Sequence, residues 1–260
     1  MLQNYSHQEP KMLNENTLSK MKELKLTGMY ESFKTQQNMN GNHNLTADQI
    51  VAKLIDAEYD YKQNKRMDQR LALAKLRYPA SVEQIDFNTE RTLDKNLFLR
   101  LVDCNFIKKS ENITITGMTG TGKSYLACAI GHNACMLGYK VIYYNFAKLL
   151  TKLKMAKADN SYLKEISRIS NFDLLILDDF GLQTMDHSGN ISLLEILEDR
   201  YGNCSTIIVS QIPSENWYDL FENPTIADAC LDRIIHNSHK LNLEGESMRK
   251  IIKSTCSKRK

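Results

Sequence analysis

One stretch of the chain decides its fold: Gly117-Met118-Thr119-Gly120-Thr121-Gly122-Lys123-Ser124. It matches the pattern G-x-x-x-x-G-K-[ST] at every fixed position. A short β-rich run, Ile113–Thr116, precedes it, and a run with helical apolar spacing, Lys123–Leu137, follows it. Glycines let the backbone wrap so that its N–H groups point at phosphate oxygens, and the helix N-terminus adds positive potential. The stretch is therefore predicted to be a phosphate-binding loop between a strand and a helix.

The loop also predicts which nucleotide groups the chain holds. In such loops the lysine, here Lys123, reaches the β- and γ-phosphates, and the hydroxyl of Ser124 binds Mg²⁺. ATP and Mg²⁺ are therefore the predicted cofactors. The residues expected to contact the nucleotide are Gly117, Met118, Thr119, Gly120, Thr121, Gly122, Lys123, Ser124 and Tyr125.

A second part of the site is predicted at the end of an apolar strand. Asp178 and Asp179 follow the run Leu174–Leu177. Asp178 is positioned to hold Mg²⁺ through water, together with Ser124. Asp179 stands where many hydrolysing proteins carry a glutamate that polarises the attacking water, and its shorter side chain leaves strong intrinsic hydrolysis open. A strand-to-loop turn with two acids and no catalytic role is the alternative.

The chain from residue 81 to 260 predicts a single α/β domain. Apolar runs alternate with helical runs, which indicates a parallel, doubly wound sheet, and runs that are apolar throughout are typical of strands covered on both faces. The expected strands are Ile113–Thr116, Val141–Tyr144, Leu174–Leu177, Ile207–Val209 and Lys240–Leu243, and the helices between them are Lys123–Leu137, Phe146–Ala156, Ile191–Tyr201 and Thr225–Ile235.

Residues 1–80 predict a small, separate helical domain. After a frayed lead-in at residues 1–15, one helix is expected from Leu18 to about Gln37. A polar, asparagine-rich break follows at Met39–Asn44. Thr46, with Gln49 three residues later, forms a capping box for a long helix. That helix is expected to run to about Leu76 and to be ended by Pro79.

Composition indicates a globular protein of the cytoplasm. Hydrophobic residues make up 42% of the 260 residues and charged residues 25%, which argues against disorder. The polar N-terminus has no apolar segment typical of a signal peptide, and no apolar run approaches a membrane span. The six cysteines are scattered and fit reduced thiols. A metal site at Cys230, His236 and His239 is disfavoured because no second ligand pair accompanies them.

Four sequence segments together resemble the AAA+ ATPases, and more narrowly the IstB-type ATPases that assist insertion-sequence transposition. The resemblance extends from about residue 13 to 253, and the last segment is the most specific. The segments are GMTGTGKSYLA, LLILDDFG, TIIVSQIPSENW and ADACLDRIIHNSHKLNLEGESMRK. The family fold is expected to be a five-stranded P-loop AAA+ sheet.

The resemblance implies further site residues. Gln211, at the end of the strand 206–209, takes the sensor-one position, where it would touch the γ-phosphate or the attacking water. Arg233 matches an arginine finger that reaches a neighbouring subunit's ATP, and Arg249 matches the second sensor arginine. Because the chain ends at Lys260, no helical lid domain is expected. A finger acting in trans implies a homo-oligomer, either a ring or a filament.

Basic residues predict contact with the backbone of duplex DNA, without sequence preference. The net charge of +3 is too small to decide this, so the argument rests on clusters. Lys62, Arg66 and Arg70 are spaced by four and share a helix face. A second group is Lys148, Lys152, Lys154 and Lys157, near the position where DnaA- and DnaC-like relatives carry a DNA-contacting helical insert. A third, shorter group lies at residues 258–260. Solvated helix faces are the alternative for each group.

Three functions remain open at the level of sequence. The first is an ATP-dependent transposition helper that assembles on DNA with ATP, remodels it and recruits the transposase of the same element, with slow, DNA-stimulated hydrolysis driving disassembly. The second is a DnaC-like loader of a replicative helicase. The third is an ATP-gated scaffold with negligible hydrolysis, which the aspartate at position 179 keeps open.

Overall fold

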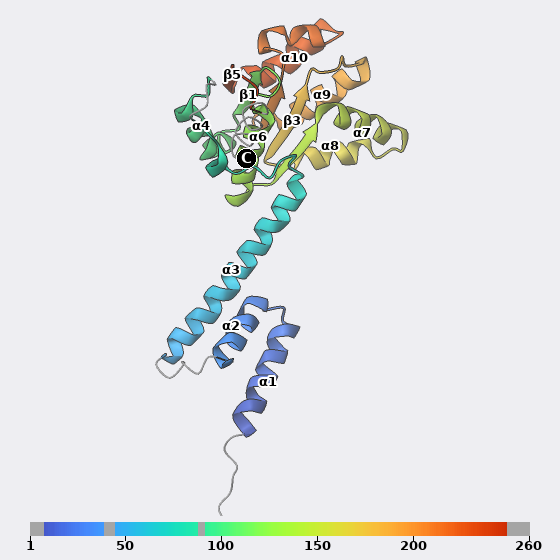
Figure 1. Ribbon diagram of the computed structural model, residues 1–260. Coiled ribbons are helices and arrows are strands. Elements are labelled where there is room, and N and C mark those ends of the chain that lie inside the picture. The colour runs from blue at the N-terminus through green and yellow to red at the C-terminus, as the bar shows by residue number, and fades with distance from the viewer. Residues whose placement is uncertain (1–7, 39–44, 88–91, 249–260) are drawn as a thin grey trace, which may run out of the picture. The chain divides into compact units, whose positions relative to one another are not determined.

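The computed structural model describes residues 8–38, 45–87 and 92–248, with side chains described from residue 14 onward. The chain divides into two compact units, residues 1–69 and 70–260 (Figure 1). The sequence placed the domain boundary at residues 80 and 81.

The first unit is helical, with α1 (Gln8–Glu23), α2 (Thr27–Asn38) and most of α3 (Ala47–Ala74). The prediction of one helix from Leu18 to Gln37 is wrong, because the chain turns at Lys25, whose φ is 58°. Helix also begins at Gln8, inside the segment expected to be frayed. A Cβ on Gly28 would lie 2.3 Å from the Ala57 carbonyl oxygen, so glycine allows α2 to approach α3.

The start of α3 is confirmed by the predicted capping box. The Thr46 amide donates to the Gln49 side chain at 3.0 Å, and the Gln49 amide donates to the Thr46 hydroxyl at 3.4 Å. The end of α3 differs from the prediction. The helix stops at Ala74, and Lys75 follows with a φ of 51°, so the chain leaves the helix before Pro79.

The second unit contains a five-stranded parallel sheet in the order β2-β3-β4-β1-β5. All five predicted strands are confirmed, and each is longer than predicted by one to three residues. Their bounds are β1 (Asn112–Gly117), β2 (Val141–Asn145), β3 (Leu174–Phe180), β4 (Ser205–Ser210) and β5 (Ser238–Leu243). Because the strands are parallel, their carboxyl ends lie at one edge of the sheet.

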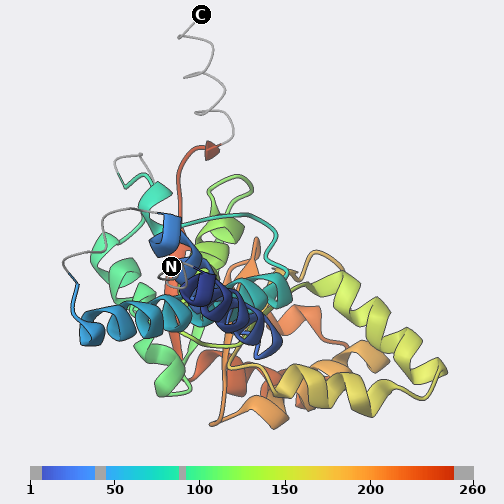
Figure 2. The ribbon, with the colours of Figure 1, turned by 90° about the horizontal axis from the view of Figure 1, so that it is seen from below.

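Helices cover both faces of this sheet (Figures 1 and 2). One buried cluster contains β1 and α6 (Lys123–Met136) with the helices α4 (Lys95–Val102) and α5 (Asn105–Lys108). The other contains residues of α7 (Phe146–Ala158), α8 (Tyr162–Ser170), α9 (His187–Arg200) and α10 (Pro224–Ile235). Apolar side chains on both faces explain why the strand sequences are apolar throughout.

Three helices were not predicted from the sequence: α4, α5 and α8. Short 3-10 turns occur at Val82–Gln84, Ser214–Asn216 and Tyr218–Leu220. The four predicted helices of this unit are confirmed, and Asn223 caps α10 through the amides of Thr225 and Ile226. Within the described ranges, every helix is too short or too polar to cross a membrane.

Candidate functional site

The phosphate-binding loop lies where β1 passes into α6. Gly117, Gly120 and Gly122 have φ angles of 143°, 91° and 95°, a region in which residues with a Cβ are strained. A Cβ on Gly117 would lie 2.1 Å from the Leu243 carbonyl oxygen of β5. Glycine is therefore required both by backbone conformation and by the neighbouring strand, and α6 begins directly after the loop at Lys123.

Lys123 is buried, with 7% of its surface exposed, and its ammonium group lies inside the loop. Its Nζ donates to the carbonyl oxygens of Gly117 at 2.6 Å and Met118 at 2.7 Å. Burial lowers the pKa of Lys123, and the nearby charges of Asp178 and Asp179 oppose that shift. The ammonium is thus held by two neutral carbonyls, which phosphate oxygens can replace with stronger, charge-assisted hydrogen bonds.

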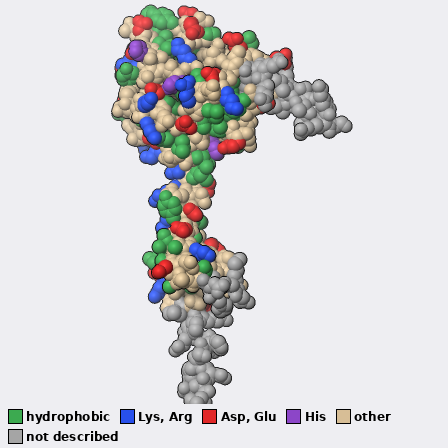
Figure 3. All heavy atoms as spheres, turned by 90° about the vertical axis from the view of Figure 1, so that its left-hand side faces the viewer, with side chains coloured by type: hydrophobic (Ala, Val, Ile, Leu, Met, Phe, Trp, Pro, Cys, Tyr) green, Lys and Arg blue, Asp and Glu red, His purple; other side chains and the backbone are tan. Residues whose placement is uncertain are grey.

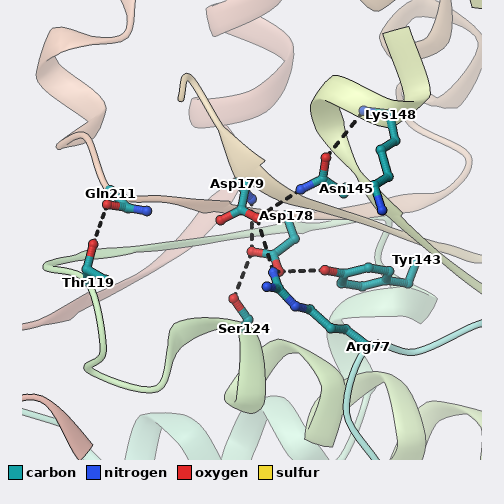
Figure 4. A network of polar contacts seen from close by, with 9 residues as sticks. All are labelled: Arg77, Thr119, Ser124, Tyr143, Asn145, Lys148, Asp178, Asp179 and Gln211. Atoms are coloured by element: carbon teal, nitrogen blue, oxygen red, sulfur yellow. Dashed lines mark hydrogen bonds and ion pairs between the residues drawn. The ribbon is translucent and has the colours of Figure 1, made fainter. Parts of the chain in front are cut away.

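Asp178 lies at the end of β3, and no part of its side chain is exposed. Its Oδ1 accepts from the Ser124 hydroxyl at 2.9 Å, and its Oδ2 accepts from the Tyr143 hydroxyl at 2.6 Å (Figure 4). Burial and the hydrogen bond to Asp178 raise the pKa of Tyr143, so the phenol stays protonated and donates. Arg77 also pairs with Oδ2 at 3.4 Å.

Asp179 occupies an irregular position in β3. The register with β4 shifts between Leu177 and Phe180, and Asp179 has a φ of 60°. Its Oδ2 accepts from Asn145 Nδ2 at 2.8 Å and pairs with Arg77 at 3.1 Å. Aspartate tolerates this left-handed conformation better than most residues with a side chain. The bulge therefore directs the second acid to the same edge of the sheet as the first.

Gln211 contacts the phosphate-binding loop directly. It follows β4, and its Oε1 accepts from the Thr119 hydroxyl at 2.5 Å (Figure 4). The polar strand end noted in the sequence thus lies beside the loop. Thr121 is fully buried and its hydroxyl donates to the Met118 carbonyl at 2.9 Å, so it supports the loop from within.

The segment after β5 also returns to the loop. The Met248 amide donates to the Gly120 carbonyl at 2.9 Å, and a Cβ on Gly120 would lie 2.2 Å from the Ser247 hydroxyl. Arg249 lies outside the described residues, but its neighbour in the chain is bonded to the phosphate-binding loop. The segment after β5 therefore reaches this loop.

Tyr125 faces the segment that precedes β1. Its hydroxyl donates to Gln84 at 2.8 Å, and its ring centroid lies 6.2 Å from that of Tyr78. Tyr125 thus follows the phosphate-binding loop in the sequence, but its side chain contacts Tyr78 and Gln84.

Arg233 lies at the opposite end of the sheet from the phosphate-binding loop. The Asn112 side chain, at the start of β1, donates to the Arg233 carbonyl at 2.9 Å. A strand rises about 3.3 Å per residue, so the six residues of β1 separate its ends by about 17 Å. The Arg233 guanidinium donates to the Ala229 carbonyl at 2.7 Å and to Glu198 at 2.9 Å. It is not part of the site formed by its own loop.

A cavity of about 150 Å³ lies at this opposite end of the sheet. Arg200, buried beside it, donates to the carbonyls of Ile169, Phe172 and Ser205 and to the Thr206 hydroxyl. Burial lowers the pKa of Arg200 to about 10. Because backbone carbonyls take up its donors, Arg200 ties α8, α9 and β4 together.

The predicted DNA-contacting residues differ in whether their charged groups are exposed to solvent or already paired within the chain. Lys148 and Arg66 are exposed, whereas Arg70 donates to the Cys135 carbonyl at 3.0 Å. Lys62 pairs with Glu58 at 3.2 Å. On α7, Lys152 pairs with Glu165, Lys154 with Asp186, and Lys157 donates to Ser188. On the face drawn in Figure 3, basic side chains are interspersed with acidic ones.

The residues at the carboxyl edge fit a hard divalent cation. The Ser124 hydroxyl oxygen and Asp178 Oδ1 lie 2.9 Å apart, and Mg²⁺ prefers a few oxygen ligands and retains several waters. Ser124 and Asp178 are the residues that would hold it beside a bound triphosphate.

Sequence reasoning missed several side chains of this site. Arg77 was not expected at this site, although it contacts both acids. Tyr143 and Asn145 lie at the carboxyl end of β2, next to β3. The polar end of that predicted strand was a usable signal, since parallel strands end at one edge. Nothing local in the sequence marks Arg77.

Fold and site together define a class of protein: the chain is an ATP-binding P-loop protein with an AAA+ fold. The chain resembles solved structures of DnaI (TM-score 0.55, 21% identity, 64% of this chain and 92% of that one) and of DnaA from Aquifex aeolicus (TM-score 0.55, 21% identity, 71% and 56%). At this identity the likeness concerns the fold.

The sequence places the chain more narrowly. It matches the family described as IstB-like ATP binding protein over residues 19–256, and the chain belongs to that family. A protein of Sinorhizobium fredii named for ATP binding in an insertion sequence, y4pL, is 40% identical over 239 residues, 92% of this chain and 98% of the relative. A second from the same organism, y4uH, is 41% identical over 240 residues, 92% and 97%.

Proposed function

We propose that the protein is an ATP-dependent transposition helper. It binds Mg²⁺ and ATP, assembles as a homo-oligomer on duplex DNA and presents that DNA to the transposase of the same insertion sequence. The observation that carries this proposal is the family match over residues 19–256, together with relatives named for insertion sequences. Hydrolysis of ATP then releases the assembly.

The phosphate-binding loop and the two acids have separate roles in binding and hydrolysing ATP. Lys123 and the loop amides bind the phosphates, while Ser124 and Asp178 hold Mg²⁺, which neutralises charge on the phosphate oxygens. Asp179, fixed by Asn145 at 2.8 Å, orients the attacking water. Gln211, bonded to Thr119 in the loop, senses the γ-phosphate end of the nucleotide.

Arg233 completes the site of a neighbouring subunit. Its position at the amino end of β1 supports this role, because the separation of about 17 Å along the strand exceeds what its side chain can bridge within one chain. Its partner Glu198 has a side chain that is 50% exposed, so the pair can open at low cost. Arg249 acts in cis, which the bond from Met248 to Gly120 supports.

DNA contact is proposed chiefly through exposed lysines of α7. Lys148 is exposed, whereas Lys152 is already paired with Glu165. A lysine that must leave a carboxylate to bind a phosphate gains less binding free energy than a solvent-exposed, unpaired lysine does. Lys148 and the weakly paired Lys154 are therefore the α7 residues that contribute most to DNA affinity, and Arg66 is the strongest candidate in the first unit.

The test is ATP-dependent assembly on duplex DNA, followed by binding titration at several salt concentrations and by electron microscopy. We expect oligomers on DNA with ATP and not with ADP. Lys148→Glu weakens DNA binding several-fold and lowers the salt slope by about 1, as loss of one phosphate contact requires. Arg100→Glu on α4, which makes the same charge change at an exposed site, leaves both unchanged.

Three other outcomes would replace this proposal. Equal DNA binding with and without ATP would contradict a nucleotide-dependent helper. Assembly without DNA-stimulated phosphate release would favour a scaffold, in which Asp179 does not support turnover. Capture of a replicative helicase in place of the transposase would favour a loader.

A further inference from the structure

The guanidinium of Arg77 pairs with both Asp178 and Asp179, the two acids whose charge a metal cation would otherwise neutralise. Its guanidinium lies 3.4 Å from Asp178 Oδ2 and 3.1 Å from Asp179 Oδ2 (Figure 4). The acids come from β3, whereas Arg77 comes from the segment after α3, 101 residues earlier than Asp178 in the chain. This contact is therefore made by the tertiary fold and not by local sequence.

The backbone around Arg77 is fixed within the second unit. The left-handed turn at Lys75, with a φ of 51°, ends α3, and Ala80 is buried in the core shared with α6. The guanidinium also lies 5.4 Å from the ring centroid of Tyr78. Burial lowers the pKa of Arg77, but its interactions with Tyr143, Tyr78 and Asp178 raise it overall, so the charge is permanent.

The other donors to Asp178 cannot balance its charge. Ser124 and Tyr143 are neutral, and they hold Oδ1 and Oδ2 respectively. Lys123 directs its ammonium to the carbonyls of Gly117 and Met118. Arg77 is thus the cationic side chain that, among the described residues, pairs directly with both acids. A divalent cation that binds Asp178 meets this fixed positive charge, which opposes it at short range.

We propose that Arg77 is a positioning residue that neutralises the acidic pair in the absence of nucleotide and excludes a divalent cation that arrives alone. Metal that arrives with a triphosphate brings negative charge, to which the guanidinium can turn when it leaves Asp178. The site then takes up metal and nucleotide together. This inference rests on the proposed role of Ser124 and Asp178 as the metal-holding residues.

The test is Mn²⁺ binding to the full chain, measured by electron paramagnetic resonance of free Mn²⁺ with no nucleotide present. We expect weak binding by the wild type. Arg77→Ala and Arg77→Gln bind Mn²⁺ at least about tenfold more tightly, because an opposing charge is gone. Arg77→Lys retains the charge and stays close to the wild type. Arg70→Ala, which removes an arginine that donates to the Cys135 carbonyl, is the matched control and also stays close.

The variants separate charge from structure. Arg77→Gln keeps a neutral hydrogen-bond donor on a shorter side chain, so it tests the proposal even where Arg77→Ala fails to fold. Unchanged or weaker Mn²⁺ binding by Arg77→Gln would overturn the role of Arg77. Repeating the titration with ATP tests the proposed function separately: absence of Mn²⁺–ATP binding by the wild type would contradict the metal site itself.

Discussion

Both ends of the sheet carry basic side chains, but the partners that hold these side chains differ between the two ends. At the carboxyl end, Lys123 faces loop carbonyls that phosphate oxygens can replace, and Arg77 faces two carboxylates that a metal ion could bind in its place. At the amino end, Arg200 is buried with its donors committed to backbone carbonyls, and Arg233 is held by one carbonyl of its own helix and by the half-exposed Glu198. Residue type alone therefore does not show which cations act on a ligand.

The difference lies in how firmly each cation is held. Removing Arg200 from its carbonyls would leave buried acceptors unsatisfied, so this residue is structural. Arg233 can leave Glu198 at little cost, because the Glu198 side chain is 50% exposed and an ion pair open to solvent contributes little. Of these two arginines, Arg233 is thus the more easily released from its partners, and this difference predicts how each substitution should behave.

The largest effect is expected from Arg233→Ala. ATP binding to the single chain should be nearly unchanged, since Arg233 lies away from the loop of its own chain. Hydrolysis in the assembled state should fall about 10³-fold, as loss of an arginine finger does. Phosphate release by assembled protein on DNA measures this. Turnover equal to that of the wild type would remove Arg233 from the reaction.

The second effect concerns the carboxyl end. Lys123→Ala removes the buried ammonium, and ATP affinity should fall on the order of 100-fold, because charge-assisted hydrogen bonds contribute about 1.5–3 kcal/mol each. Calorimetric titration with Mg²⁺–ATP checks it. Lys109→Ala, an exposed lysine beside the cavity at the amino end, is the control and should bind ATP normally. Equal losses in both variants would abolish the distinction between the ends.

The smallest effect on the reaction, and the clearest on folding, is expected from Arg200→Met. This change leaves three carbonyls and one hydroxyl without their buried donor, and should lower the free energy of unfolding by about 3 kcal/mol. Denaturant titration measures it. ATP affinity of the folded fraction should be unchanged. A stable variant that no longer binds ATP would show that the amino end acts on the loop.

The strands and the loop could be predicted because their signals are local. The pattern from Gly117 to Ser124 and the apolar run before Asp178 each specify a conformation within a few residues. The break between α1 and α2 was missed because Leu24 and Leu26 continue an apolar pattern through a turn. Helix α8 was missed although its sequence carries a local signal, because Tyr162, Ile166 and Ile169 lie at i, i+4 and i+7 and pack into the core.

The site was only partly predictable because several of its contacts join distant segments. Arg77, Tyr143 and Asn145 reach the acids from two other parts of the chain. For the basic residues, the sequence predicted their common position on a helix but not their partners. Their spacing gave the shared helix face, but only the fold shows that Arg70 and Lys152 already have partners.

The central claim is that each ATP site is completed by the opposite end of a neighbouring chain. Mixing Arg233→Ala with Asp179→Asn tests it most directly, because neither variant alone has a complete site. With DNA and ATP, the equimolar mixture should recover up to about a quarter of wild-type phosphate release, since head-to-tail contacts pair an intact acid with an intact arginine. Phosphate release no greater than the sum of the two separate variants would contradict the account.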